Sequence, residues 1–209
     1  MSRGRVTPGV RCGPMRAPTV QPSPTPVGQE VEVKYRVGDL DGLLAALAAA
    51  GLVLSDPVDQ DDQAYAPTWW SYGQPKTGVP FARLRTQAAR QVFTVKVPLD
   101  NELACAEHET LVDDGDQMHA AVLAMGFRPT VRIVKRRRTA AFDGLSLCVD
   151  VVDGLGVFLE VERLVTAGES GREVQADLDR FVGSLGVSVE RVTDTYDSLL
   201  RARGPELTD

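Results

Sequence analysis

Five consecutive residues, Glu30-Val31-Glu32-Val33-Lys34, alternate charged and apolar side chains in the manner of a β-strand. Successive side chains of a strand point to opposite sides, so the two glutamates and the lysine share one face and the valines share the other. A strand at the edge of a sheet, with one face in water, would give the same pattern. These residues alone therefore leave open whether the charged face points to solvent or to an enclosed interior.

Charged residues with period-two spacing also occur in six further strand-like segments. They are Arg83 and Arg85, Lys96, Glu107 and Glu109, Lys135 and Arg137, Asp150, and Glu160 and Glu162. Any one such segment could simply face water, but seven of them favour the inside of a closed barrel. With the first strand included, that interior would hold seven acidic and six basic side chains.

An interior with this many charges needs a physical reason. Burying a charge is costly unless the charge is paired or coordinates a ligand. Carboxylates are the ligands that hard cations such as magnesium and manganese prefer, and the guanidinium forks of arginine fit phosphate oxygens. The combination therefore predicts a site for a polyphosphate with a bound divalent metal.

The order of the predicted elements indicates an α+β fold. Asp143-Gly144 is a typical two-residue hairpin turn between two strand-like segments. Eight segments of this kind, interrupted by two helices, favour an eight-stranded antiparallel β-barrel with helices packed outside over alternating βαβ units. The predicted strands are the one that begins near Glu30 and the segments 52–65, 81–86, 91–98, 103–112, 128–142, 145–152 and 156–165.

Two of the predicted helices interrupt the strands and two follow them. The first lies behind Asp39, a suitable cap, and ends at Gly51. The second spans 117–125, and the C-terminal part contains an apolar stripe over 174–185 and a shorter element over 194–203. On the second helix the inner face is predicted to consist of Met118, Ala121, Val122 and Met125.

The composition indicates one globular domain, which we expect at residues 29–203. The chain has 209 residues, of which 43% are apolar and 25% charged. Residues 1–28 contain six prolines and four arginines, so a disordered tail is expected there, and residues 204–209 are expected to form a short C-terminal tail.

Several locations and classes of function are disfavoured. The longest run without a polar side chain, 43–54, has 12 residues, well short of the roughly 20 that span a bilayer, and the start lacks the apolar core of a signal peptide. A cytoplasmic protein without a membrane segment is therefore expected. A net charge of −6 argues against a general nucleic-acid binder. Cys12, Cys105 and Cys148 lack any paired spacing and are expected to be incidental thiols.

With these residues in view, the chain resembles the CYTH superfamily, the triphosphate tunnel enzymes that include class IV adenylate cyclases, thiamine triphosphatases and inorganic triphosphatases. The stretch from Glu30 to Lys34 looks like the family's E-x-E-x-K signature. The resemblance covers essentially residues 29–201 and implies a tunnel of eight antiparallel strands with helices outside. Two further segments look most like the bacterial class IV cyclase-like branch, namely Gly154-Leu155-Gly156-Val157-Phe158-Leu159-Glu160-Val161-Glu162 and Thr195-Tyr196-Asp197-Ser198-Leu199-Leu200.

The resemblance also implies roles for the charged residues. Lys34 would orient the nucleophile or steady the leaving group, so it is a predicted catalytic residue together with Glu30 and Glu32. The phosphate chain would be bound by Lys34, Arg83, Arg85, Lys96, Lys135 and Arg137. One or two magnesium or manganese ions would be held by Glu30, Glu32, Glu160 and Glu162, with Asp150 or the pair Glu107 and Glu109.

The predicted substrate is a small-molecule triphosphate: ATP, thiamine triphosphate or tripolyphosphate. Two reactions fit the same tunnel, hydrolysis by a metal-activated water and cyclisation of ATP to cyclic AMP with release of pyrophosphate. The alternatives are a polyphosphate- or nucleotide-binding module without turnover and, with less support, a protein-interaction domain that uses the tryptophan-rich loop. A homodimer is left open.

The chain departs from the family pattern after the first helix. The family commonly places an aspartate two residues before a tyrosine and a phenylalanine. Here Asp61, Asp62, Gln63 and Ala64 precede Tyr65, and Ala66 replaces the second aromatic, so substrate contacts near this strand are not expected to follow the family pattern. The loop 67–80 contains Trp69, Trp70 and Tyr72, and a lid that packs on its own barrel is favoured over stacking on a base. Neither histidine, His108 nor His119, is the predicted general base, and Arg136 and Arg138 are expected on the exterior.

Overall fold

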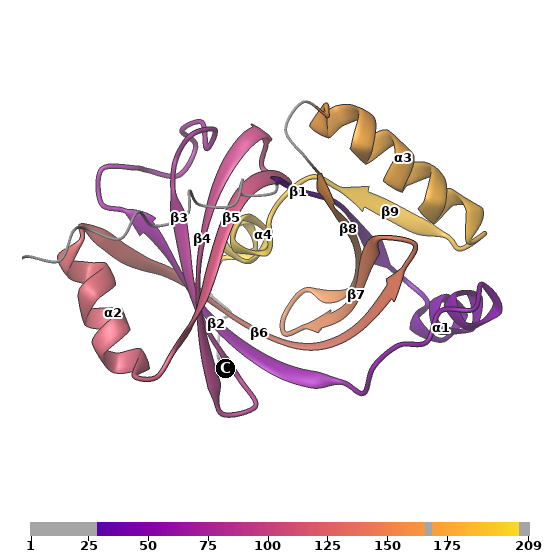
Figure 1. Cartoon of the computed structure of the whole chain (residues 1–209), viewed down its shortest axis with the longest axis horizontal. Coiled ribbons are helices and arrows are strands. Elements are labelled where there is room, and N and C mark those ends of the chain that lie inside the picture. Colours follow the sequence, from indigo (N-terminus) through magenta and orange to yellow (C-terminus); the bar gives the residue numbers. More distant parts are fainter. Residues whose placement is uncertain (1–28, 166–168, 205–209) are drawn as a thin grey trace, which may run out of the picture.

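The strands of the computed structural model form one antiparallel sheet that closes on itself (Figure 1). The structure describes residues 29–165 and 169–204. The strand order is β5-β4-β3-β2-β6-β7-β8-β1-β9, and β1 also pairs with β5, so that eight strands form a closed barrel. The strands are β1 (Gln29–Val37), β2 (Val58–Pro67), β3 (Phe81–Gln87), β4 (Arg90–Asn101), β5 (Ala104–Val112), β6 (Phe127–Phe142), β7 (Leu145–Val152), β8 (Gly156–Val165) and β9 (Val189–Val192).

The predicted eight-stranded antiparallel barrel with helices outside is confirmed. A ninth short strand, β9, was missed by the sequence analysis. It pairs with the C-terminal half of β1, from Lys34 to Val37, beyond the point where β1 pairs with β5. The sequence of β9 has only four residues, and the strand exists because β1 offers it a free edge, so its existence depends on the tertiary fold.

The apolar face of β1 points out of the barrel into the main hydrophobic core. Val31, Val33 and Tyr35 lie there beside strands β7 and β8. Two helices, α1 (Leu40–Ala49) and α3 (Gly171–Ser184), cover this side of the barrel (Figure 1). Their buried contributions are Leu43 and Leu47 from α1 and Val174, Leu178 and Val182 from α3. Both faces of β1 are therefore enclosed, and the charged face lies inside the barrel.

Helix α2 (Gly115–Ala124) packs on the opposite side of the barrel, and the prediction of its inner face was wrong for two residues. Val122 is buried against Tyr65 and Ala82, as expected for the inner face. Ala121 and Met125, also predicted on that face, are exposed, Met125 to 60%. Met125 lies after the last helical residue, where Gly126 takes a φ of +87° and turns the chain into β6, so the helical spacing no longer applies there.

The turns and the tryptophan-rich loop follow the sequence predictions. Asp143 and Gly144 both have positive φ, +49° and +75°, as a type I′ hairpin turn between β6 and β7 requires. In the loop between β2 and β3, Trp70 is 2% exposed and packs edge-on against Tyr72 and Phe81, so this residue belongs to a lid that packs on its own barrel. Trp69 is 67% exposed.

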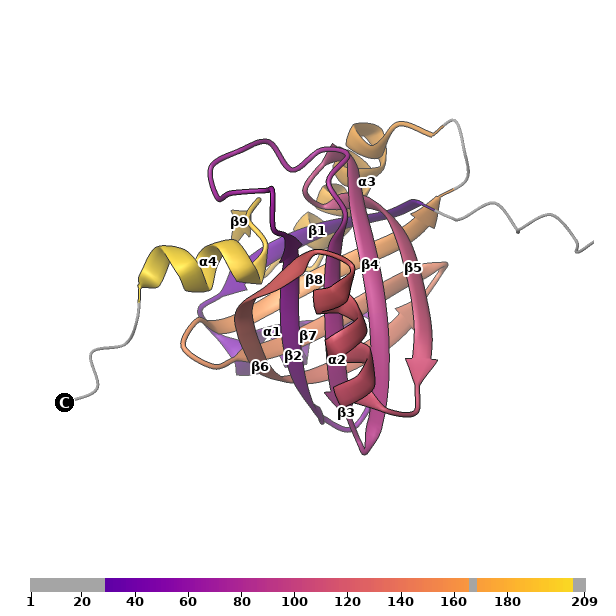
Figure 2. The same ribbon diagram turned by 90° about the vertical axis from the view of Figure 1, so that its left-hand side faces the viewer.

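Helix α4 (Tyr196–Arg203) lies at one end of the barrel. It is seen end-on in the middle of the ring of strands in Figure 1, and Figure 2 shows it projecting away from the barrel. Its first residue, Tyr196, is buried with Ile133, Val152 and Phe158. The expected tails, 1–28 and 204–209, lie outside the described residues except for Gly204. Within the described ranges, we find no helix of the length and hydropathy needed to cross a membrane.

Candidate active site

The barrel encloses a cavity of about 200 Å³ whose walls carry most of the predicted site residues. It is formed by the charged faces of the strands, so the period-two pattern of the sequence becomes the wall of a tunnel. The predicted residues that line it are Glu30, Glu32, Lys34, Arg83, Lys96, Lys135, Arg137, Glu160 and Glu162.

Three carboxylates form an acidic cluster in this cavity. The ligand oxygens of Glu30, Glu32 and Glu162 lie within 4.8 Å of one another. Burial, and then the negative charges of Glu32, Glu160 and Glu30, raise the pKa of Glu162 to about 8. A carboxyl that is buried beside other carboxylates is costly to ionise. A divalent cation would supply the missing positive charge, and three carboxylate oxygens are suitable ligands for magnesium or manganese.

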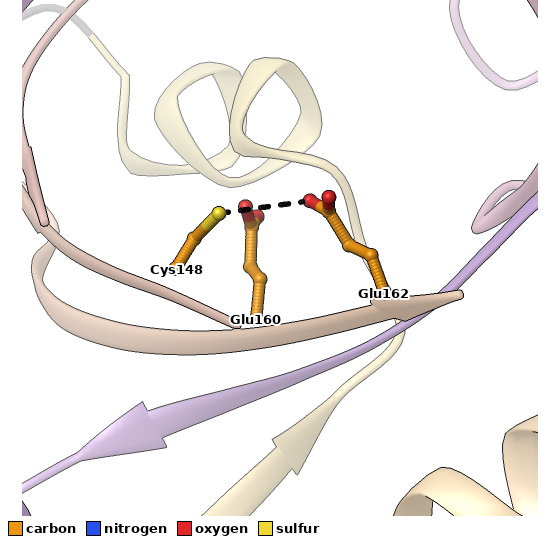
Figure 3. A group of neighbouring side chains, drawn as sticks. All are labelled: Cys148, Glu160 and Glu162. Atoms are coloured by element: carbon orange, nitrogen blue, oxygen red, sulfur yellow. Dashed lines mark hydrogen bonds between the residues drawn. The ribbon is translucent and has the colours of Figure 1, made fainter. Parts of the chain in front are cut away.

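A second group shares Glu162 but fits a hard cation less well. Figure 3 shows Cys148, Glu160 and Glu162 side by side on strands β7 and β8, with the Cys148 thiol 4.0 Å from Glu162 Oε1. Glu160 already binds Lys34 at 3.2 Å and also Arg137. Because thiolates suit softer metals and Glu160 is already paired, the acidic cluster of Glu30, Glu32 and Glu162 is the better magnesium or manganese site.

Lys34 lies between the acidic cluster and the rest of the tunnel. Its Nζ is 3.2 Å from both Glu32 and Glu160 and donates to the backbone carbonyl of Asp194 at 3.5 Å. Burial alone would lower the pKa of this lysine, but the two carboxylates outweigh burial and raise it. Lys34 is therefore a permanent cation that can stabilise negative charge, and it is unsuited to accept a proton.

The opposite wall carries an excess of positive charge. Burial and the neighbouring Arg137 lower the pKa of Lys135 to about 8. Burial and the nearby Arg85 likewise lower the pKa of Arg83, whose Nε is buried without a hydrogen-bond partner among the described residues. Cations that depress each other's pKa need an anion, and the guanidinium groups here can donate several hydrogen bonds to phosphate oxygens.

Two buried aspartates hold parts of this basic wall in place. Asp62 accepts two hydrogen bonds of 2.7 Å from Arg85. Asp150 is fully buried and accepts from Lys135 Nζ at 2.9 Å and from Arg137. The metal role predicted for Asp150 stays a prediction, and its contacts in this structure are those of a group that orients the two phosphate-binding side chains.

The predicted pair Glu107 and Glu109 is split between two environments. Glu107 does not line the cavity itself, but its carboxylate is 2.7 Å from Lys96, which does, and Lys96 also binds Glu30 at 2.8 Å. The Glu109 side chain is 52% exposed at the rim and lies 3.5 Å from Arg83. The structure thus brings Glu107 close to the acidic cluster through Lys96 and leaves Glu109 at the edge of the site.

The fold agrees with the comparisons with known proteins. A family model described as the CYTH domain matches residues 28–196. The chain belongs to the CYTH domain family.

Relatives of this CYTH domain carry adenylate cyclase names. A putative adenylate cyclase of Methanocaldococcus jannaschii is 22% identical over 84% of this chain and 98% of its own length. The adenylate cyclase CyaB of Aeromonas hydrophila is 28% identical over 81% of this chain and 87% of its own length. At this level of identity the relatives agree with membership of the CYTH domain family.

Solved structures share the same CYTH fold. A protein from Pyrococcus horikoshii superposes with a TM-score of 0.69 at 23% identity and covers 83% of this chain and 99% of its own. A putative adenylyl cyclase from Hippeastrum, described as having a dominant triphosphatase activity, superposes with a TM-score of 0.58 at 18% identity over 85% of this chain and 98% of its own. Both therefore support the closed barrel.

Neither histidine lies in the CYTH tunnel, and some tunnel residues escaped the sequence analysis. His108 is exposed on β5, and His119 on α2 forms a hydrogen bond of 2.7 Å with Tyr65 outside the cavity. Of the missed residues, Asp62 was named but given no role, although it lies two positions from Gln60 on the inner face of β2. The others that line the cavity include Lys76, Thr94, Glu102 and Tyr196. The segment from Thr195 to Leu200 was recognised in the sequence, but no role was predicted for the Tyr196 side chain.

Proposed function

We propose that this protein is a divalent-metal-dependent enzyme that hydrolyses the triphosphate group of a small molecule inside the barrel. One observation carries the proposal: a single cavity holds a cluster of three carboxylates and a wall of cationic side chains. Burial and the neighbouring carboxylates raise the pKa of Glu162, and burial and the neighbouring cations lower the pKa values of Lys135 and Arg83. A metal-bound triphosphate would bring positive charge to the carboxylates and negative charge to the cations.

In this proposal the acidic residues bind the metal and the basic residues bind the triphosphate. Glu30, Glu32 and Glu162 would hold magnesium or manganese, with Glu107 and Glu160 as the nearest further carboxylates. When bound, the metal would neutralise phosphate charge and favour ionisation of the attacking group. The triphosphate would be bound by Arg83, Arg85, Lys96, Lys135 and Arg137.

Lys34 would act on the reacting phosphate. Its side chain is 3% exposed, and it remains positively charged beside Glu32 and Glu160. Phosphoryl transfer depends mainly on positioning and on neutralising charge, so a fixed ammonium group can stabilise the charge that develops on the transferred phosphate or on the leaving group.

Of the two reactions, hydrolysis requires fewer groups to be held in a defined position. It needs a water molecule at the terminal phosphate, whereas cyclisation needs a ribose 3′-hydroxyl held in line with the α-phosphate. Formation of cyclic AMP from ATP is the second candidate, and the adenylate cyclase names of the two curated relatives favour it. The same metal-binding and phosphate-binding residues would serve both reactions.

The test is product analysis with the purified full-length chain. With manganese or magnesium present, tripolyphosphate, ATP and thiamine triphosphate are each incubated, and phosphate, pyrophosphate and cyclic AMP are measured. We expect phosphate release, and we expect Glu32→Gln to abolish it by removing a metal ligand without changing the side-chain shape. Arg136→Gln, on the exposed outer face of β6, is the matched control and should retain full activity.

Two outcomes would contradict the proposal. Tight triphosphate binding by the wild-type chain without any product would support the binding module instead. Full activity of Glu32→Gln would show that the acidic cluster is not needed for the reaction.

A further inference from the structure

We propose that Tyr196 is a positioning residue that holds the ammonium groups of Lys34 and Lys135 in place through the face of its aromatic ring. This inference rests on the proposed function, because it assigns the two lysines to the binding and reaction of a triphosphate. Tyr196 comes from the start of α4, far along the chain from both lysines, and lines the same cavity.

Both lysines lie against the same ring. Lys34 Nζ is 4.4 Å from the ring centroid of Tyr196, and Lys135 Nζ is 5.0 Å from it. The face of an aromatic ring carries partial negative charge and attracts ammonium groups at these distances, most strongly where water is excluded. One neutral side chain thus stabilises two like charges that would otherwise repel each other.

The orientation of the ring is fixed by its other contacts. The Tyr196 hydroxyl donates to Asp150 Oδ2 at 3.1 Å, and the same carboxylate accepts from Lys135. Burial, followed by the charges of Glu160 and Asp150, raises the pKa of this phenol far above its usual range, so the hydroxyl stays a donor. The Phe158 ring packs edge-on against the Tyr196 ring, with the two ring centroids 5.1 Å apart. The ring therefore cannot turn its face away from the lysines without losing these contacts.

An aromatic ring suits this task better than a carboxylate would. An ammonium group has three N–H donors, and a carboxylate would occupy some of them. The ring attracts the charge as a whole and leaves the donors free for oxygens. For Lys135, which donates to Asp150, this leaves donors for the phosphate chain.

The helix that carries Tyr196 is itself tied to the barrel and to the lid. Lys34 donates to the carbonyl of Asp194, immediately before the helix. Asp197 accepts hydrogen bonds from Thr130 Oγ1 at 2.8 Å and from the Tyr72 hydroxyl at 3.4 Å. These contacts set the position of α4 along the barrel axis and hence the position of the ring in the tunnel.

The experiment replaces Tyr196 by phenylalanine and then by ring-fluorinated phenylalanines, introduced at this codon in the full-length chain. Fluorine withdraws electrons from the ring face with little change in shape, so all members should fold. We expect Tyr196→Phe to keep kcat/KM for the triphosphate within about threefold, and kcat/KM to fall stepwise as fluorine atoms are added, by at least tenfold across the series. Equal kcat/KM values across the series would overturn the proposal, as would a Tyr196→Phe variant that is as impaired as the most fluorinated one.

A control separates ring electrostatics from helix packing. Leu199→Ala removes apolar packing from the same helix and should lower Tm while leaving kcat/KM within twofold. If the wild-type chain turns over no triphosphate, the proposed function fails, and the same series is then compared by calorimetry for its affinity for tripolyphosphate. A stepwise loss of affinity would support the positioning role independently of catalysis, and an unchanged affinity would overturn it.

Discussion

Glu160 and Glu162 lie on the same face of β8, but their pKa values shift in opposite directions because their neighbours differ. Glu160 lies between Lys34 and Arg137. Burial alone would raise its pKa, but these cations hold it well below its usual range. Glu162, two residues later, lies with Glu30 and Glu32, and its pKa is raised to about 8. The first carboxylate is therefore already neutralised by the protein, and the second is neutralised by a proton unless a metal ion replaces it.

This contrast makes metal binding depend on pH. Because Glu162 must lose its proton to bind a cation, we expect the affinity for manganese to increase about tenfold per pH unit from pH 6 to pH 8 and to level off above the pKa of about 8. Calorimetry at pH 7 should show release of about one proton per metal ion bound. The measurement is the manganese Kd across pH 6 to 9 in buffers of different ionisation enthalpy.

Matched variants identify the residue responsible for the pH dependence. Glu162→Gln should bind manganese weakly and with a flatter pH dependence. Glu190→Gln, at an exposed position on β9, should behave as the wild-type chain. An affinity that does not change between pH 6 and pH 8 would exclude Glu162 as the ligand that titrates.

At the scale of elements, most strands and helices could be predicted because their signals are local. Period-two alternation marks a strand wherever one face is apolar, and Asp39 and Asp114 accept hydrogen bonds from the first turns of α1 and α2, as helix-capping residues do. The short strand β9 gave no such signal, because its pairing depends on the free edge of β1. Met125 was misplaced because the helical period was extended beyond the end of the helix.

The site residues that the sequence did not predict depend on the register of strand β2 and on the docking of helix α4. Asp61 and Asp62 are neighbours in the sequence, so only one can face the tunnel. Pairing of β2 with β3 and β6 sends Asp62 inward to Arg85 and Asp61 outward to Arg132. For Tyr196, the motif around it could be quoted from the sequence, but its contact with the two lysines arises from the docking of α4 at the barrel end.

The lid and α4 are joined by Lys76, and this connection can be tested. Lys76 Nζ binds Glu102 at 2.5 Å and Ser198 Oγ at 2.7 Å, so it links the lid loop to β5's entry turn and to α4. We expect Lys76→Met to lower stability by about 1 kcal/mol, given that Glu102 is partly exposed, and Tm by about 2–4 °C. Chymotrypsin should also cut the lid faster, beginning at the exposed Trp69.

The control removes a comparable ion pair away from the lid. Arg163 and Glu169 form such a pair at 2.8 Å. Arg163→Met should leave the rate of cleavage in the lid unchanged. Equal cleavage rates for Lys76→Met and the wild-type chain would show that Lys76 does not restrain the lid.

For the whole molecule, the net charge of −6 conceals a separation of charge inside the barrel. Acidic side chains gather around Glu30, Glu32 and Glu162, while Lys135 and Arg137 lie with Arg83 and Arg85 along the basic wall. A triphosphate alone would satisfy the basic wall but bring negative charge towards the acidic cluster. A divalent metal alone would stabilise the acidic cluster but bring further positive charge towards the basic wall.

The two ligands should therefore stabilise the fold cooperatively. A ligand present at a hundred times its Kd stabilises a folded protein by about 2.7 kcal/mol, which corresponds to about 5–11 °C in Tm for a domain of this size. We expect manganese and tripolyphosphate together to raise Tm by more than the sum of their separate effects, because each removes the repulsion that opposes the other. Glu32→Gln should lose the effect of manganese and the cooperativity while keeping a shift with tripolyphosphate alone. Strictly additive shifts in the wild-type chain would mean that the acidic cluster and the basic wall bind their ligands independently, and a shared metal-triphosphate site would then be ruled out.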